Sequence, residues 1–346
     1  MNYEKEIDVS FKKALVTGGC GFIGSNLVQK LVCEGWQVDI VDDMSSGQLE
    51  FLDNIDIRVV LSDALHLYEN QAEESRSRER VLVIQGDFVH DNVLNRVRTG
   101  KYDVIFHLAA NPRVEYSVKN PIATTETNLF KTVALFSASV GFVKRIVFSS
   151  SSAVYGDQET LPTAEDADKS PNSPYGLQKL QCEQFSQMFC KLYDADIVCL
   201  RYFNVYGPRQ TGDSAYSTAI SSWCNKVSNN EKLRSDGDGT QTRDLIFVDD
   251  VATANIMAAE HNRKFEGESF NIASGTSYSN NQILEMFKDR FETVEIVDAP
   301  WRSGDVMHTK ANTIASKFIL SFEATTPLHE GLRQTWHWWN FNKKEL

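Results

Sequence analysis

Short apolar runs alternate with longer helical patterns over the first two hundred residues of the chain. The runs typical of buried strands are ALVTGG, QVDIVDD, RVLVIQGD, YDVIFHLAA, VKRIVFSSS and ADIVCLRYFN. Amphipathic segments such as GSNLVQKLVCEGW lie between them. Strands this apolar suit a parallel sheet that helices cover on both faces, so the pattern indicates βαβ units. We therefore predict an α/β fold, a doubly wound parallel sheet that continues through about residue 205.

The regular alternation weakens after Gly207. Turn-rich pieces follow (TGDSAYS, SDGDGTQTRD and ASGTSYSNN), and the aromatic segment TWHWWNF lies near the C-terminus. We predict that residues 206–346 form a smaller, discontinuous lobe that caps the strand ends, and that a segment near 240–262 returns to the large domain of residues 1–205. The aromatic segment is predicted to fill this lobe rather than to stack on a base; its tryptophans are Trp336, Trp338 and Trp339.

An unusually long connection separates Gly47 from the strand at Val81. It ends in the charge-rich stretch ENQAEESRSRER. Runs of charge mostly mark exposed faces of a protein. We therefore interpret residues 48–80 as a solvated helix or insertion, in preference to a partner-binding tail.

Composition narrows the class of protein. The chain has 346 residues, 42% hydrophobic and 24% charged, which is ordinary globular composition. A net charge of -12 disfavours nucleic acid and anionic membranes as partners. The six cysteines form no C-x-x-C pair, the seven histidines show no metal-ligand spacing, and no signal peptide or apolar stretch of membrane-spanning length is visible. We expect a cytoplasmic protein with reduced thiols and no metal.

A glycine-rich turn between the first strand and the first helix is the most specific motif. Gly18 allows the tight turn, Gly21 lets the backbone approach a pyrophosphate, and Gly24 lets the helix pack closely on the strand. The next strand ends in Asp42, at the distance where an acid meets the adenosine ribose. A carboxylate there would repel a 2′-phosphate, so the motif predicts a Rossmann-type NAD site; Asp43 is the less favoured ribose ligand.

Two other strand ends carry polar residues. Asp87 follows a strand and is interpreted either as a ligand of the adenine amine or as a simple turn acid. His107 ends the strand IFHLAA, and we interpret it as a structural residue or a neighbour of the cofactor rather than a metal ligand.

A third strand ends in small hydroxyl residues, in the run FSSSSAVYG over 148–156. Parallel α/β folds bind ligands at this edge of the sheet. Downstream, Tyr175 and Lys179 lie one turn apart at the start of a predicted helix. A nearby ammonium favours the phenolate, so this spacing predicts a tyrosine with a lowered pKa that serves as general acid and base.

These motifs together resemble one family. TGGCGFIGSNL, HLAA, SSSSAVYG, PYGLQK, RYFNVYGPRQ and GDGTQTRDLIFVDDV are similar to the extended short-chain dehydrogenase/reductase family, and most of all to its NAD-dependent nucleotide-sugar 4-epimerases. The stretch RQTGDSAYSTAISSW resembles the UDP-N-acetylglucosamine 4-epimerase branch. The resemblance implies a Rossmann domain with a smaller C-terminal α/β substrate-binding lobe, a UDP-sugar substrate, and a homodimer formed through residues 126–139 and 177–189.

The resemblance also implies a mechanism. Ser151, or alternatively Ser152, would bond the sugar O4, Tyr175 would exchange the proton, and Lys179 would hold the nicotinamide ribose. A hydride would pass from C4 to NAD, the 4-keto sugar would rotate, and the hydride would return to the opposite face. Dehydratases of the family carry Asp-Glu after the catalytic Thr, whereas this chain has Ala153 after Ser152, which favours epimerisation.

Further ligands follow from the same resemblance. Beyond the glycines, Asp42 and Asp87, the implied cofactor contacts are Phe22, Ile23, Phe88, Leu108, Ala109, Ala110, Asn128, Ser149 and Tyr202. The implied substrate contacts are Asn204, Arg243 and Arg302 for the diphosphate, Asp305 for a ribose hydroxyl, and Thr309 beside the sugar. A threonine at 309 leaves room for an N-acetyl group without requiring one.

Several positions depart from the family pattern and leave the sugar open. Ser235 and Asp236 replace an apolar residue and a Tyr or Asn, and Asn312 replaces an Asp. Arg113 is interpreted either as a ligand of an acidic sugar or as the partner of Glu115. The alternatives are a UDP-glucuronate epimerase, a dehydratase or reductase, and a non-catalytic NAD-binding scaffold.

Overall fold

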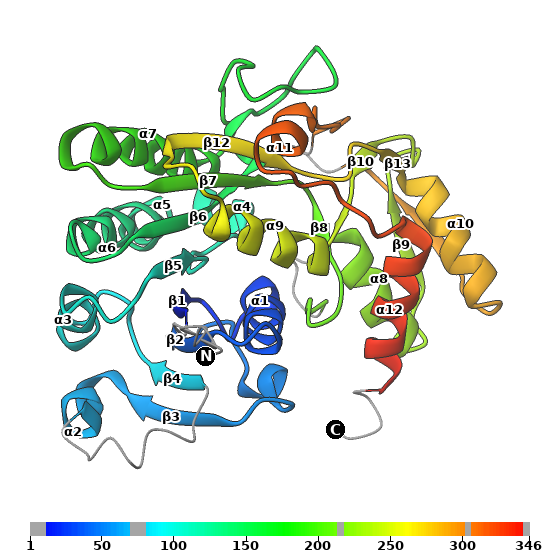
Figure 1. Ribbon diagram of the computed structural model, residues 1–346. Helices are drawn as coiled ribbons and strands as arrows, with labels where there is room; N and C mark the ends of the chain where they lie inside the picture. The colour runs from blue at the N-terminus through cyan, green and yellow to red at the C-terminus, as the bar shows by residue number, and fades with distance from the viewer. Residues whose placement is uncertain (1–11, 70–80, 213–217, 302–305, 342–346) are drawn as a thin grey trace, which may run out of the picture.

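An eight-stranded sheet forms the centre of the molecule (Figure 1). The computed structural model describes residues 12–69, 81–212, 218–301 and 306–341. Within them the strand order is β3-β4-β2-β1-β5-β6-β7-β12, and each neighbouring pair is parallel. The strands are β1 (Lys13–Thr17), β2 (Gln37–Asp42), β3 (Ile57–Leu61), β4 (Val81–Gln85), β5 (Val104–His107), β6 (Arg145–Ser151), β7 (Ile197–Tyr202) and β12 (Glu266–Ile272). The predicted doubly wound parallel sheet is confirmed.

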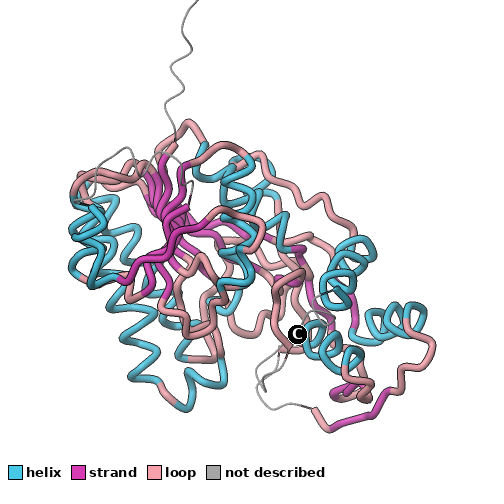
Figure 2. The backbone as a smooth tube through the Cα atoms, turned by 90° about the horizontal axis from the view of Figure 1, so that it is seen from below, coloured by secondary structure: helices cyan, strands magenta, loops and turns pink. Residues whose placement is uncertain are grey.

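Helices cover both faces of this sheet, as the view along it shows (Figure 2). One face packs against α1 (Phe22–Cys33) and α9 (Val248–Glu260). The other packs against α3 (Asp91–Arg98), α6 (Lys131–Ser139) and α7 (Pro174–Tyr193). Among the described residues, no helix combines the length and apolarity needed to cross a membrane.

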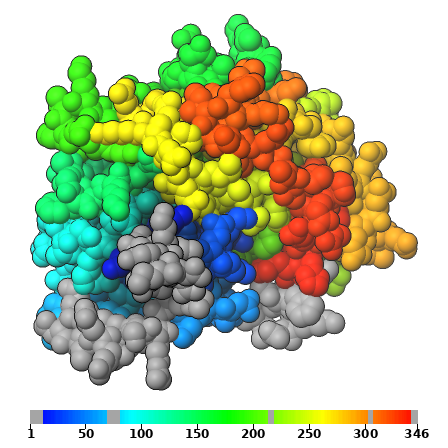
Figure 3. Space-filling view, in the orientation of Figure 1, coloured from blue at the N-terminus to red at the C-terminus, as the bar shows by residue number. Residues whose placement is uncertain are grey.

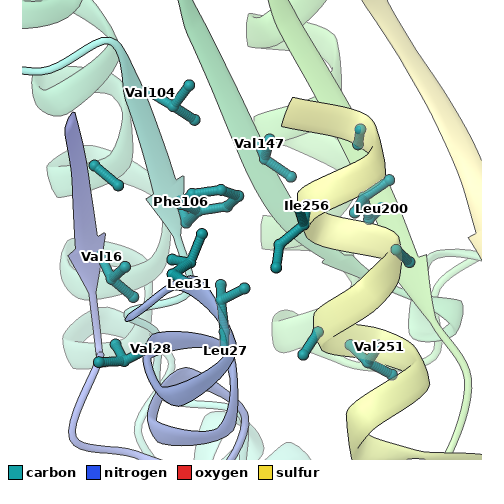
Figure 4. Packing of buried hydrophobic residues seen from close by; sticks show 14 of the residues in the cluster. Val16, Leu27, Val28, Leu31, Val104, Phe106, Val147, Leu200, Val251 and Ile256 are labelled. Carbon is teal, nitrogen blue, oxygen red and sulfur yellow. The ribbon is translucent and has the colours of Figure 1, made fainter. Parts of the chain in front are cut away.

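Strand residues alternate between the two cores. Ala14 and Val16 lie in the core beneath α1 and α9, and Leu15 between them lies in the opposite one. Side chains of successive strand residues point to opposite faces, so both sets must be apolar where both faces are covered. Figure 4 shows the first core, where Leu27 and Leu31 of α1 face the sheet beside Phe106.

The long connection after β2 contains an edge strand that the sequence prediction missed. Residues 49–52 form the short helix η1 (Leu49–Leu52), and β3 follows and pairs with β4 from Ile57↔Val81 to Leu61↔Gln85. The interpretation of 48–80 as a solvated helix or insertion is therefore wrong for residues 57–61. Val59 and Leu61 are exposed, so β3 lacks the signature of a buried strand. The elements η2 (Ser62–Ala64) and α2 (Leu65–Glu69) follow, and residues 70–80 lie outside the described residues.

Smaller helices connect the remaining parts of the large sheet. Two short helices and a π-helical turn lie between β5 and α6, and another short turn follows β6. These elements are α4 (Val114–Lys119), α5 (Pro121–Thr125), η4 (Glu126–Phe130) and η5 (Ser152–Val154).

The second half of the chain builds a smaller group of strands and helices with its own core. Its two-stranded pairs are β8 (Val205–Tyr206) with β11 (Ile246–Phe247), β9 (Leu233–Asp236) with β14 (Ile296–Ala299), and β10 (Thr242–Asp244) with β13 (Ser277–Ser279). Its helices are α8 (Ala219–Ser228), α10 (Asn280–Arg290), α11 (Ile314–Ile319) and α12 (Leu328–Phe341). The return to the large sheet includes β12, which lies beyond the 240–262 segment named from the sequence.

The aromatic segment on α12 packs within this lobe, as predicted for Trp336, whose ring lies 5.2 Å from that of Phe287 between centroids. Trp339 is partly buried against the same core. Trp338 instead reaches the other lobe, where its ring lies 6.1 Å from Phe51 of η1. Blue N-terminal residues accordingly border the red C-terminal helix on the surface (Figure 3).

A buried ion pair connects β7 to α7. Arg201 donates to both carboxylate oxygens of Glu183, at 2.9 and 2.7 Å, and both side chains are at most 5% exposed. Glu183 also accepts the Ser150 hydroxyl at 2.5 Å, and Arg201 donates to the Tyr155 hydroxyl at 2.7 Å. Each ion is thus paired and hydrogen-bonded, the condition under which a buried charge is tolerated.

Removing one member of this pair should destabilise the protein strongly. We expect Arg201→Met to lower the free energy of unfolding by about 3–5 kcal/mol, because it leaves the Glu183 carboxylate buried without its cation. Adding Glu183→Met should recover part of that loss. Urea unfolding measures both, and Lys144→Met, which breaks the exposed pair with Asp103, should cost no more than about 1 kcal/mol. A double variant no more stable than Arg201→Met would contradict the argument.

Candidate active site

The predicted functional segments meet at one edge of the sheet. Strand pairing places Thr17 beside His107, His107 beside Phe148, and Ser151 beside Tyr202. Because the strands are parallel, the loops that leave their carboxyl ends all emerge at this edge. The glycine turn, the loop after β5 and the serine run therefore lie next to one another.

The glycine turn has the shape that a pyrophosphate requires. Gly18 has a φ of 71°, and a Cβ there would stand 2.9 Å from the backbone nitrogen of Ala109. A Cβ on Gly24 would lie 2.1 Å from the Gly18 carbonyl oxygen, whereas one on Gly21 would meet only that oxygen, at 3.3 Å. Among the described residues no side chain caps α1, whose first residues include Phe22 and Ile23. An uncapped helix N-terminus reached by bare backbone favours an anion.

Asp42 is fixed against this turn. Its carboxylate accepts the backbone N–H of Cys20 at 3.0 Å and that of Met44 at 2.9 Å. Burial raises the pKa of Asp42 above its usual value, and the two N–H donors oppose that rise. Asp43 is exposed and accepts the N–H of Ser45. The turn and the buried acid beside it together fit a dinucleotide.

The next strand end offers fewer free groups. Asp87 accepts Lys131 Nζ at 2.6 Å and the N–H of Val89 at 3.1 Å. The ring of Phe88 is buried, with its centroid 5.0 Å from that of His107. A contact of Phe88 with a cofactor would therefore come from its main chain, and the adenine contact of Asp87 stays a prediction.

His107 is part of a hydrogen-bonded chain. The Thr132 hydroxyl donates to the Asn128 carbonyl oxygen at 2.8 Å, so Nε2 of His107 must be the donor in its 2.9 Å contact with Thr132. Nδ1 then accepts the Thr17 hydroxyl at 2.7 Å, and the Thr17 oxygen accepts the N–H of Ala109 at 3.1 Å. Burial lowers the pKa of His107 to about 3. His107 is thus a neutral structural residue, one of the two roles expected for it.

Lys179 and Tyr175 both lie buried on the first turns of α7. Lys179 Nζ donates to the Ser149 carbonyl oxygen at 2.6 Å, and burial lowers the pKa of Lys179 to about 8. Tyr175 donates its backbone N–H to the Ser117 hydroxyl at 3.2 Å.

The sequence predicted a lowered pKa for Tyr175, and this prediction is wrong when the groups of the protein alone are considered. Burial raises the pKa of Tyr175, and the opposing influence is a hydrogen bond with the Ser151 side chain. Lys179 Nζ lies 5.9 Å from the centre of the tyrosine ring. Desolvation of the phenolate therefore outweighs the hydrogen bond from Ser151.

The serine run divides between two sides of β6. The Ser150 hydroxyl faces the buried ion pair, whereas Ser151, one residue on, interacts with Tyr175. Ser151 Oγ also accepts the N–H of Ala153 at 3.2 Å. Its strand neighbour Tyr202 is buried and donates its hydroxyl to Asn255 at 2.9 Å. The structure thus brings Ser151 to the predicted general acid and base.

The Asn128 amide is engaged by the loop after β5 and by α7. Its side-chain oxygen accepts the N–H of Asn111 at 2.7 Å, and its Nδ2 donates to the Asn111 carbonyl oxygen at 3.1 Å and to Gln178 at 2.8 Å. The amide therefore holds Asn111, the residue that follows Leu108, Ala109 and Ala110 in the loop after β5. Sequence reasoning missed Gln178, because its helix carries several glutamines and nothing in the local sequence distinguishes this one.

A second residue that sequence reasoning missed organises the smaller lobe. Asp244, fully buried, accepts hydrogen bonds from the backbone of Ser274, Gly275 and Ala311 and from the Ser274 hydroxyl. Its own N–H donates to the Thr309 hydroxyl at 3.1 Å. Asp244 thus fixes the segment that carries Thr309. The signal was an acid inside the run TRDLIF.

The predicted substrate residues are only partly assembled by these contacts. Asn204 Nδ2 donates to the Asp244 carbonyl oxygen at 2.8 Å and to the Thr309 hydroxyl at 3.1 Å, so a phosphate contact would replace one of these bonds. Arg243 donates to the carbonyl oxygens of Thr242 and Met307. Arg302 and Asp305 lie outside the described residues, as does part of the RQTGDSAYSTAISSW stretch.

The departures from the family pattern have local contacts of their own. Ser235 is buried, and Asp236 pairs with Arg234. The Asn312 carbonyl oxygen accepts Asn271 Nδ2 at 3.0 Å. Glu115 pairs with Lys119.

Within the described residues, no three His, Cys, Asp or Glu side chains gather as a metal would require.

Comparison with known proteins agrees with this geometry. Residues 14–273 match the NAD dependent epimerase/dehydratase family. A UDP-glucose 4-epimerase of Mycolicibacterium smegmatis is 32% identical over 93% of this chain and 97% of that protein. Among solved structures, a UDP-N-acetylglucosamine 4-epimerase from Methanobrevibacter ruminantium in complex with UDP-N-acetylmuramic acid has a TM-score of 0.84 and 34% identity, over 96% of this chain and 99% of that one. The structure of a UDP-glucose 4-epimerase from Thermotoga maritima with UDP-glucose has a TM-score of 0.83 and 31% sequence identity. The match covers 96% of this chain and 100% of that one.

The hydrogen-bonded chain around His107 predicts a particular pH dependence. The pKa of this histidine is about 3 in the fold and about 6.5 in an unfolded chain, so the unfolded state binds more protons between these values. Stability is therefore lost as pH falls below about 6.5, with a slope approaching about 1.4 kcal/mol per pH unit from this group. His107→Gln should lack that contribution.

Denaturant unfolding of both proteins between pH 7 and 5 measures the difference in slope. The exposed His329 provides the control, since His329→Gln should keep the wild-type dependence. Equal slopes in the wild type and His107→Gln would show that His107 is not neutral and buried in the folded state.

Proposed function

Because the chain belongs to the NAD-dependent epimerase/dehydratase family, whose cofactor is NAD, we propose that it is a UDP-sugar 4-epimerase. It inverts C4 of a UDP-hexose or UDP-N-acetylhexosamine through a 4-keto intermediate. The observation that carries the proposal is the meeting of Ser151, Tyr175 and Lys179 at the carboxyl edge of the sheet, with Ala153 following the serine run.

The large domain of residues 1–205 holds the cofactor in this proposal. The turn of Gly18, Gly21 and Gly24 receives the pyrophosphate, Asp42 the adenosine ribose, and Lys179 the nicotinamide ribose. NAD held by these residues would supply the acceptor and the donor of the hydride at C4 of the sugar. The buried ammonium has one described protein acceptor, Ser149, so its other N–H groups are available to ribose hydroxyls.

Tyr175 carries the proton. In its phenolate form, which the hydrogen bond with Ser151 favours, its oxygen would accept the proton of the sugar 4-hydroxyl as the 4-keto group forms, and the resulting phenol would give that proton back when the hydride returns. Ser151 would bond the same sugar oxygen, and its hydrogen bond with Tyr175 supports this shared role. Ser152 is the less favoured partner, because Ser151 is the residue that interacts with Tyr175.

Ala153 distinguishes epimerisation from dehydration. Elimination of water needs a side chain that accepts or donates a proton beside the 4-keto sugar, and the family's dehydratases have acids after the catalytic Thr. Ala153 has no proton to exchange. The 4-keto intermediate is therefore reduced again rather than dehydrated.

The smaller lobe, residues 206–346, holds the UDP-sugar. Thr309 stands beside the sugar, with its hydroxyl held by Asn204 and by the backbone of Asp244. This small side chain supports either a plain or an N-acetylated hexose. The similar structures carry different nucleotide sugars, UDP-glucose in one and UDP-N-acetylmuramic acid in another. Arg243, Arg302 and Asp305 are the proposed ligands of the UDP moiety.

The proposal is tested with a panel of nucleotide sugars. The protein is incubated with UDP-glucose, UDP-galactose, their N-acetylated forms and UDP-glucuronate, and products are identified by NMR. We expect a C4 epimer without free NADH or a stable keto sugar. Tyr175→Phe should retain NAD and lose most of the turnover, since only the proton carrier is removed. No epimer from any sugar would refute the substrate class, and full activity of Tyr175→Phe would refute the mechanism.

The same family membership leads us to propose a homodimer. Residues 126–139 and 177–189 were named from the sequence as its helices, and exposed apolar side chains lie on and beside them. Phe130 is 65% exposed, Leu177 46%, and Ile122 on the neighbouring α5 85%. Exposed apolar side chains grouped on adjacent helices suit a second copy of the chain.

Sedimentation or light scattering should give twice the chain mass of 39.1 kDa. Ile122→Asp places a charge in the proposed interface and should shift the protein toward the monomer. Phe318, on α11, is 79% exposed and lies outside this surface, so Phe318→Asp should leave the dimer intact. A monomeric wild type would rule out the interface.

A further inference from the structure

Gln178 lies on α7 between the two proposed catalytic residues of that helix, and its amide is buried. Its side chain makes three hydrogen bonds. Oε1 accepts Asn128 Nδ2 at 2.8 Å, and Nε2 donates to the hydroxyls of Thr124 and Thr125, each at 3.0 Å. A buried amide with this many partners has a single orientation.

That orientation is fixed from the loop after β5. The N–H of Asn111 can only donate, so it defines Asn128 Oδ1 as the acceptor and turns Nδ2 toward Gln178. Gln178 Oε1 must then accept, and its Nε2 must donate to the threonines. The Thr124 hydroxyl in turn donates to the Asn120 carbonyl oxygen at 3.1 Å. The donor and acceptor roles are thus fixed in sequence, from the loop through the amides of Asn128 and Gln178 to the threonine of α5.

The loop after β5, where this series of hydrogen bonds begins, lies between the glycine turn and α7. Ala109 donates its N–H to Thr17, and its backbone is in contact with Gly18. Asn111 is bonded twice to Asn128, at 2.7 and 3.1 Å. Gln178 therefore joins the helix of the proton carrier to the loop that adjoins the cofactor turn.

We propose that Gln178 is a positioning residue, which sets Tyr175 and Lys179 relative to the loop Leu108–Asn111. The inference rests on the proposed function for its kinetic consequence, since that loop and α7 must hold the reacting groups in register. A displacement of about 1 Å in such a site lowers turnover by up to about 100-fold. Gln178 acts through Asn128, because the three hydrogen bonds of its side chain go to Asn128, Thr124 and Thr125.

The test compares Gln178→Leu, which has similar volume and no amide, with the wild type, both loaded with NAD. We expect kcat to fall about 10- to 100-fold, with KM within about twofold. Hydrogen exchange in a peptide covering residues 108–113 should accelerate by about tenfold, because the loop loses support equivalent to one or two hydrogen bonds. Gln178→Met, of the same length, replaces the leucine variant if that one does not fold.

Ser186→Ala provides the matched control. Ser186 is buried on the same helix, and its hydroxyl donates to Cys182 at 2.9 Å without reaching Asn111 or Asn128. Its loss should lower the melting temperature and leave both kcat and the exchange of residues 108–113 unchanged. Equal effects of the two variants, or unchanged exchange in Gln178→Leu, would overturn the proposal.

The exchange measurement separates this inference from the proposed function. If the wild type epimerises no UDP-sugar, the function is wrong, and the exchange of residues 108–113 still decides whether Gln178 holds the loop. If the wild type is active and exchange accelerates without any fall in kcat, the positioning role is refuted while the function stands.

Discussion

Both faces of the parallel sheet are covered by helices, and this constraint governs where chemistry can occur. In the central strands most side chains lie in one of two apolar cores, so a polar group there has no access to a ligand. The strand ends are the places where backbone N–H groups, carboxylates and hydroxyls can face outward. The glycine turn, Asp42, the loop after β5 and the serine run lie at such ends, and α7 supplies the remaining groups from the side.

Several polar side chains buried near this edge are hydrogen-bonded to one another, and this pairing restricts their movement. His107 is held between two threonines, and Glu183 between Arg201 and Ser150. A buried polar group that loses its partner carries the full penalty of desolvation, so each network resists rearrangement. This rigidity would suit the proposed epimerisation, in which the sugar turns while the groups around it stay still. Asp244 plays the equivalent part in the smaller lobe.

The sequence predicted the elements whose pattern is local. The apolar strands, the glycine turn and the Tyr175–Lys179 spacing could each be read from a few neighbouring residues. It missed β3, because an edge strand with exposed valine and leucine lacks the signature of a buried one. It also gave the wrong direction for the pKa of Tyr175, since the depth of burial depends on segments distant in the chain.

In the candidate site, too, residues were predicted from local motifs whereas their contacts were not. Ser151 was predicted from its motif, but its separation from Ser150 depends on which side of β6 faces α7. Asn128 was expected beside the cofactor, and its amide turned out to be engaged by Asn111 and Gln178. The contacts of Gln178 and Asp244 join segments far apart in sequence, so a local pattern such as the acid inside TRDLIF could not indicate their partners. The contact between Phe51 and Trp338 is the extreme case, because its two partners lie in segments far apart along the chain. The segment after β2 can gain this support only once Trp338 has left the ribosome, so it reaches its final packing later than the strands beside it.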